Sequence, residues 1–154
     1  MPKLFISHAT EDRRLADQVR THFGHFDDDR IFIAPDGVPP GEAGWRTILG
    51  AIADSDLFIL VATPAACAST AVQREIQEAV RLGKKIVPLR WGIRHHELPE
   101  LVRNTDCQSF DLKDTRDRTH LFNHYGRIAG QGYFWKGVAV TLGVLLAFYL
   151  ATAK

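Results

Sequence analysis

Short apolar runs alternate with amphipathic segments along most of this chain, and the alternation predicts its secondary structure. The apolar runs have the length of β-strands, whereas the longer segments repeat apolar residues at i, i+3, i+4 and i+7, as amphipathic helices do. The predicted strands cover residues 3–7, 30–34, 57–62, 85–89 and 107–112. The predicted helices cover residues 13–26, 45–53, 70–82, 98–103 and 116–128. Strands that alternate with helices in this way predict an α/β fold.

The third predicted strand, residues 57–62, is apolar on both faces, which is typical of a central strand in a parallel sheet. We therefore expect a flavodoxin-like five-stranded parallel sheet of order 2-1-3-4-5, flanked by helices. In that order a ligand binds at the switch point, beyond the carboxyl ends of strands one and three. The loops at residues 7–12 and 63–69 end there.

Glu75 lies in the second turn of a predicted helix that begins near Thr70, where Thr70 and Gln73 fit a capping box. The helical period places Glu75 on the shoulder of the apolar face. A carboxylate there would be half desolvated, as a catalytic acid or base often is. The alternative is a solvated charge balanced by neighbouring arginines. The position of the helix directly after the loop at residues 63–69 places Glu75 beside the expected ligand site.

Two further features allow more than one interpretation. Trp45 could stack on a nucleotide base, but its helical spacing with Ile48 and Ile52 favours a tryptophan at the edge of the core. His120 and His124 are spaced as helical metal ligands would be, but no carboxylate lies between them. We therefore predict surface histidines and no metal site.

The composition is that of an ordinary folded domain. The chain has 154 residues, 45% of them hydrophobic, and a formal net charge of +1, so no basic field indicates a nucleic-acid partner. Cys67 and Cys107 lack the spacing of a disulfide framework or a zinc site, which favours a reducing compartment. The N-terminus does not resemble a signal peptide.

The last part of the chain is an uncharged run of 17 residues from Gly137 to Ala153, bounded by Lys136 and Lys154. With the aromatic residues before Lys136 it reaches about 30 Å as a helix, the thickness of a bilayer core. We expect residues 131–154 to form a C-terminal hydrophobic helix that anchors the protein as a single-pass membrane protein. Basic residues before the run place the domain of residues 1–130 in the cytoplasm. The alternative is a buried or oligomer-forming helix.

A family resemblance rests on successive segments of the first 112 residues. The segments are ISHATEDR, PDGVPPGE, AIADSDLFILVAT, VQREIQEAV and GKKIVPL. In this order they resemble the boxes of a Toll/interleukin-1 receptor (TIR) domain of the bacterial type. The resemblance implies the same five-stranded fold, with either cleavage of the nicotinamide–ribose bond of NAD+ or homotypic association in signalling. In enzymatic members the catalytic glutamate lies in a W-x-x-x-E motif. Glu75 matches this glutamate, and Ala71 takes the tryptophan position.

The resemblance also implies further site residues. The expected substrate-binding residues line the nucleotide side and the entrance of the Glu75 helix: Ser7, His8, Ala9, Thr10, Asp36, Ser69 and Ala71. The turn-rich loop after the second strand is expected to gate the site or to contact a second copy: Asp36, Gly37, Val38, Pro39, Pro40, Gly41 and Glu42.

The function that follows is an NAD+ glycohydrolase or ADP-ribosyl cyclase-type effector, active on self-assembly in bacterial antiphage or stress defence. NAD+ is the substrate, and no cofactor is expected. A carboxylate such as Glu75 can stabilise the oxocarbenium-like transition state of glycosidic cleavage. Two alternatives remain: a catalytically silent, membrane-anchored TIR adaptor that acts by homotypic interaction, which Ala71 favours, and a membrane-disrupting effector in which the domain only assembles.

Overall fold

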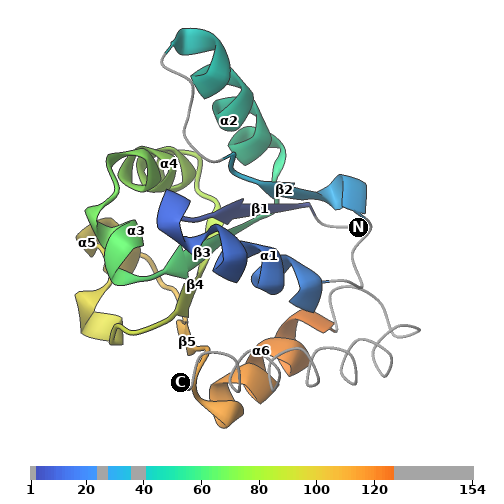
Figure 1. Cartoon of the computed structure of the whole chain (residues 1–154), viewed down its shortest axis with the longest axis vertical. Helices are drawn as coiled ribbons and strands as arrows, with labels where there is room; N and C mark the ends of the chain where they lie inside the picture. Colours follow the sequence, from blue (N-terminus) through green and yellow to red (C-terminus); the bar gives the residue numbers. More distant parts are fainter. Residues whose placement is uncertain (1–2, 24–27, 36–40, 127–154) are drawn as a thin grey trace.

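The computed structural model describes residues 3–23, 28–35 and 41–126 (Figure 1). Five strands form one sheet: β1 (Leu4–Ser7), β2 (Ile31–Ile33), β3 (Leu57–Ala62), β4 (Lys85–Arg90) and β5 (Phe110–Asp111). Every neighbouring pair is parallel, and the strand order is β2-β1-β3-β4-β5. The predicted flavodoxin-like sheet is confirmed, and all six residues of the central strand β3 are buried.

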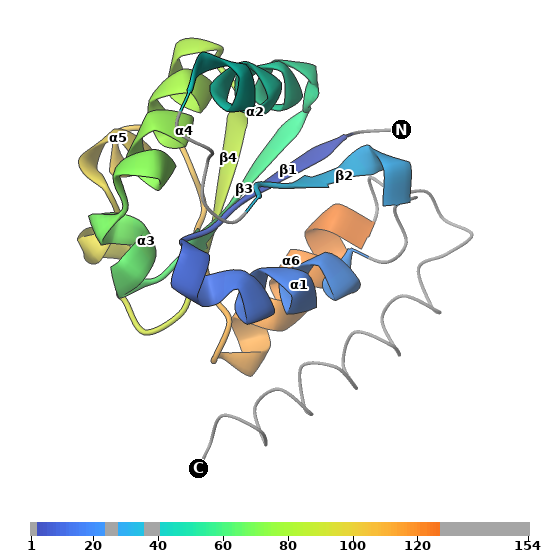
Figure 2. The same cartoon turned by 45° about the horizontal axis from the view of Figure 1, so that its top comes forward.

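Helices cover both faces of this sheet (Figures 1 and 2). One face carries α1 (Arg13–His22) and α6 (Thr115–Gly126). The other face carries α2 (Glu42–Asp54), α3 (Pro64–Ala68), α4 (Thr70–Arg81) and α5 (Glu100–Arg103). Three short 3-10 turns complete the described elements: η1 (Thr10–Asp12), η2 (Asp28–Arg30) and η3 (His95–Glu97).

The alternation of side chains along β1 divides the core between these two layers. Leu4 and Ile6 pack in the layer formed by α1 and α6, here called the α1–α6 layer. Phe5 packs in the layer formed by α2, α3, α4 and α5, here called the α2–α4 layer. Phe5 stacks between Phe32 and Phe58 of the neighbouring strands, with ring centroids 5.4 and 5.3 Å away. The same alternation turns the next polar residue of β1 toward the α2–α4 layer, where the candidate site lies.

The segment before α4 differs from the expected loop. Residues Pro64–Ala68 form the short helix α3, because Pro64 fits the first helical turn and the Thr63 hydroxyl accepts a hydrogen bond from the Ala66 amide. The cap of α4 is also different from the predicted one. The Ser69 hydroxyl, rather than that of Thr70, accepts a hydrogen bond from the Val72 amide.

Within the described ranges, no helix combines the length and the apolar character needed to cross a membrane. The predicted hydrophobic helix of residues 131–154, with its run from Gly137 to Ala153, lies outside the described residues. The membrane anchor and the domain boundary near residue 130 therefore stay predictions.

Candidate functional site

Ser7 and Glu75 meet in the layer between the sheet and α4. Ser7 is the last residue of β1, and its hydroxyl donates a hydrogen bond of 2.5 Å to Oε2 of Glu75. Ser7 is fully buried, and Glu75 is only 3% exposed. The contact joins the end of β1 to the second turn of α4, beside the central strand β3 that pairs with β1. A carboxyl group thus lies at the carboxyl edge of the sheet, at its switch point.

The expected half-solvated position of Glu75 is wrong, because Glu75 belongs to the buried side of α4 together with Val72, Ile76 and Ala79. Burial raises the pKa of Glu75 to about 7, and the hydrogen bond from Ser7 opposes this rise. Near neutral pH the acid and carboxylate forms are therefore both populated. The alternative of a solvated charge balanced by neighbouring arginines is wrong as well, because Glu75 is buried and its pKa is raised.

A second carboxylate lies at the same edge of the sheet. The Thr63 hydroxyl at the end of β3 donates a short hydrogen bond to Oδ2 of Asp12, which follows β1. Thr63 is 3% exposed and also caps α3, so its position is tightly held. Neither residue is among the predicted site residues, although both belong to the two loops that the predicted strand order brings together.

The other predicted nucleotide-side residues have different surroundings. His8 is buried, with Nδ1 2.7 Å from the Ala9 carbonyl oxygen and Nε2 2.8 Å from that of Ala34. These contacts tie its ring to the backbone that follows β1 and to the backbone that follows β2. Ala9 is buried, and Thr10 is exposed at the start of η1. The structure therefore joins Ser7 to Glu75 but turns His8 toward the chain itself.

The predicted residues around the start of α4 lie close to its first turn. Ser69 is half-buried as the helix cap, and Ala71 is exposed. Of the predicted assembly loop, the structure describes Gly41 and Glu42. Gly41 precedes α2 with a φ of +144°, a conformation that favours glycine. Glu42 is exposed and pairs with Arg46 at 3.4 Å.

The remaining predicted loop residues lie outside the described part of the chain: Asp36, Gly37, Val38, Pro39 and Pro40.

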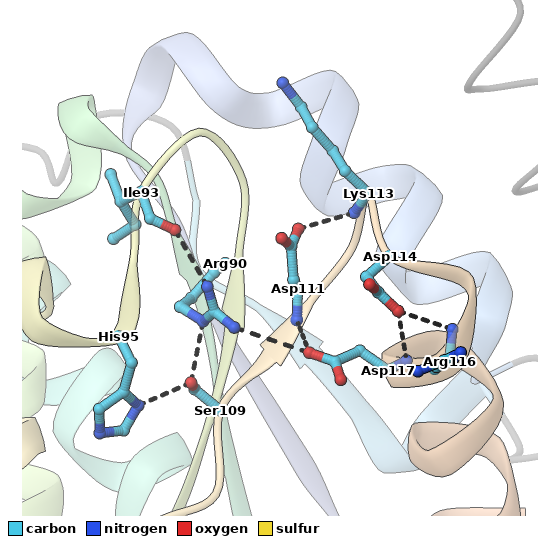
Figure 3. A network of polar contacts seen from close by, with 9 residues as sticks. All are labelled: Arg90, Ile93, His95, Ser109, Asp111, Lys113, Asp114, Arg116 and Asp117. Atoms are coloured by element: carbon cyan, nitrogen blue, oxygen red, sulfur yellow. Dashed lines mark hydrogen bonds and ion pairs between the residues drawn. The ribbon is translucent and has the colours of Figure 1, made fainter.

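A separate polar network surrounds Arg90 at the end of β4 (Figure 3). The Arg90 guanidinium donates hydrogen bonds to the Ser109 hydroxyl at 2.9 Å and to the Ile93 carbonyl at 3.2 Å, and it lies 3.6 Å from Asp117. Ser109 Oγ also lies 2.7 Å from Nδ1 of His95. These groups satisfy one another and tie β4 to β5 and α6, so the network is a structural connection at this end of the sheet.

The structure also contains a cavity of about 290 Å³ beside β5 and α6. Its described lining residues are Gln108, Phe110, His120, Asn123 and His124. None of these five is a carboxylate, and none belongs to the Ser7–Glu75 contact. Among the residues described, no group of three or more His, Cys, Asp or Glu side chains could hold a metal ion. His120 and His124 are exposed, as predicted.

A comparison with protein families decides the family of this chain. The model of the TIR domain matches residues 4–124. The chain belongs to the TIR domain family. No match was found among curated proteins.

Two solved structures share the fold of this chain. The TIR domain of the Toll-related receptor TRR-2 from Hydra magnipapillata is 17% identical, with a TM-score of 0.62 over 85% of this chain and 100% of that one. The CMP N-glycosidase BcmB of Clostridium botulinum is also 17% identical, with a TM-score of 0.54 over 80% of this chain and 99% of that one. At this identity the similarity establishes the fold alone.

Proposed function

We propose that this TIR domain cleaves the nicotinamide–ribose bond of NAD+ with Glu75 as its catalytic carboxylate. The observation that carries the proposal is the buried carboxyl group at the switch point, whose pKa is raised to about 7 by burial. Domains of this family associate with one another and bind NAD+. The similarity in fold to a CMP N-glycosidase agrees with cleavage of an N-glycosidic bond.

The chemistry requires one well-placed carboxylate. The bond between ribose C1′ and the nicotinamide nitrogen breaks, and its electron pair leaves with neutral nicotinamide. The positive charge that develops on the ribose is stabilised by ionised Glu75. Water then adds to C1′ and loses a proton, which gives ADP-ribose, whereas attack by the adenine of the same molecule gives a cyclic product. Ser7 holds the carboxylate in place before the substrate binds.

Access to Glu75 must change when the substrate binds, because only 3% of its surface is exposed. We infer that association of several copies accompanies this change, so that the rate per molecule rises with protein concentration. A variant that cannot self-associate but keeps full activity at all concentrations would contradict this part of the proposal.

The proposal is tested by the consumption of NAD+ by the purified chain, with the products separated by chromatography. Glu75→Gln should abolish consumption, because glutamine has a similar shape but no charge. Glu78→Gln is the matched control, since Glu78 lies one turn further along α4 and pairs with Arg81 at 2.6 Å. Equal consumption by the wild type and Glu75→Gln would overturn the proposal.

A second candidate function is a catalytically silent adaptor. Two observations favour it: Glu75 is almost completely buried, and Ala71 provides no aromatic side chain at the start of α4. In that case Glu75→Gln would leave self-association and signalling intact, and the wild type would not consume NAD+.

We also propose that the run from Gly137 to Ala153 anchors the domain to a membrane with residues 1–130 in the cytoplasm. The support is the length and apolar character of the run and the basic residues before it. Fractionation of cells that express the full chain, or a chain ending at residue 136, tests this proposal. The full chain should sediment with membranes and resist extraction at high pH, whereas the shortened chain should not. Equal distribution of both would contradict the anchor.

A further inference from the structure

Arg74, the residue before Glu75, contacts the aromatic ring of Trp45. The central carbon of its guanidinium lies 4.2 Å from the centroid of the ring. Trp45 is half-buried against the α2–α4 layer of the core, and Arg74 is exposed. The two helices that carry these residues lie side by side on the same face of the sheet (Figure 2). A cation over an aromatic face is attracted to it, so Trp45 restricts the orientation of Arg74.

Arg74 differs from the other arginines of these two helices. Arg46 pairs with Glu42 at 3.4 Å, and Arg81 pairs with Glu78 at 2.6 Å. No carboxylate among the described residues forms an ion pair or hydrogen bond with Arg74. A guanidinium has five N–H donors in a planar arrangement that fits two oxygens of a phosphate. Arg74 is thus an oriented cation whose donors remain available.

The location of Arg74 connects it with the candidate site. In a parallel sheet a helix that follows a strand begins at the carboxyl edge, so the first turns of α2 and α4 lie at the same edge as Ser7. Trp45 is in the first turn of α2, and Arg74 is in the second turn of α4. Ala71, one turn before Arg74, is exposed and has only a methyl group. The space beside the guanidinium is therefore free of a large side chain from that position.

We propose that Arg74, oriented by Trp45, binds the pyrophosphate of the substrate and makes the site selective for a dinucleotide over an unphosphorylated nicotinamide riboside. This inference rests on the proposed cleavage of NAD+, whose reacting bond lies on the ribose next to the pyrophosphate. The anionic pyrophosphate complements the guanidinium, while Glu75 faces the ribose. Because Trp45 fixes the guanidinium in advance, less conformational entropy is lost on binding.

The test compares the hydrolysis of NAD+ and of nicotinamide riboside by the full chain. Arg74→Ala should lower kcat/KM for NAD+ by about 10- to 100-fold, mainly through KM, because the loss of hydrogen bonds to a charged group weakens binding by about this factor. The value for nicotinamide riboside should change by less than about twofold, because this substrate has no phosphate. Trp45→Ala should also lower kcat/KM for NAD+, but by a smaller factor, and Trp45→Phe should keep most of the wild-type value.

The chain offers a matched control pair on the other side of the sheet. The Lys113 ammonium lies 4.8 Å from the centroid of the Trp91 ring, and Trp91 packs against the α1–α6 layer. Trp91→Ala and Lys113→Ala should leave the ratio of the two kcat/KM values unchanged. If Arg74→Ala lowers kcat/KM for both substrates by the same factor, Arg74 has only a structural role, and the inference is overturned.

Binding of ADP-ribose to the full chain, measured by calorimetry, separates this inference from the proposed function. If the wild type cleaves neither substrate, the proposed function fails, but ADP-ribose affinity still reports on Arg74. A loss of about 10-fold or more in Arg74→Ala then supports a pyrophosphate site. Equal affinity in both proteins, or no binding by the wild type, overturns the inference.

Discussion

Replacing Glu75 with glutamine should remove activity and at the same time stabilise the domain in alkaline solution. The pKa of Glu75 is raised from 4.5 to about 7 by burial. Between these values the folded protein binds one proton more than the unfolded chain, so stability falls as pH rises. The difference between the two pKa values corresponds to about 3 kcal/mol. The unfolding free energy of the wild type is lower by this amount above pH 7 than at pH values below 4.5. Glutamine is always neutral and carries no such cost.

Urea denaturation at pH 5 and pH 8 measures this effect. At pH 5 the two proteins should be nearly equal in stability, because Glu75 is then largely protonated in the folded protein. At pH 8 the Glu75→Gln variant should be more stable by about 1–3 kcal/mol. Glu78→Gln should show no such gain, because Glu78 is not buried in the core. A Glu75→Gln variant that is less stable than the wild type at both pH values would show that ionisation of buried Glu75 does not destabilise the domain.

Two further predictions concern pH. If ionised Glu75 is the active form, kcat/KM should rise with pH to a plateau above about 7. The hydrogen bond from Ser7 lowers the pKa of Glu75, so its loss in Ser7→Ala should move this midpoint to higher pH. Ser55 is also buried but does not contact Glu75, so Ser55→Ala should not move the midpoint. Burial, and secondarily the charge of Arg118, lowers the pKa of His22 to about 4. The unfolded chain then binds the extra proton, so stability should fall by up to about 3 kcal/mol from pH 6.5 to 4. His22→Gln should flatten this decline in denaturation curves, and an unchanged decline would contradict the assignment.

The sheet could be predicted from the sequence because its signals are local. The apolar run of β3 indicates a central strand, and that central position favours the flavodoxin-like order. The short helix α3 also has a local signal, because Thr63 followed by Pro64 is typical of a helix start.

The geometry of the site could not be predicted in the same way, because it depends on contacts between distant segments. Helical periodicity places Glu75 at the edge of an apolar face, but its burial depends on how α4 packs against the end of β1. The contact between Trp45 and Arg74 likewise requires α2 and α4 to be neighbours. His8 matched the family pattern, yet its ring contacts the backbone of its own domain.

Cleavage of NAD+ by Glu75 is tested most directly by the rate of nicotinamide release at pH 8, measured for the wild type and Glu75→Gln at several protein concentrations. At this pH the variant should be at least as stable as the wild type, so a loss of activity cannot result from unfolding. Release by the wild type should increase with protein concentration and should be lost in the variant. Equal release by both proteins, or no release by the wild type at any concentration, would contradict it.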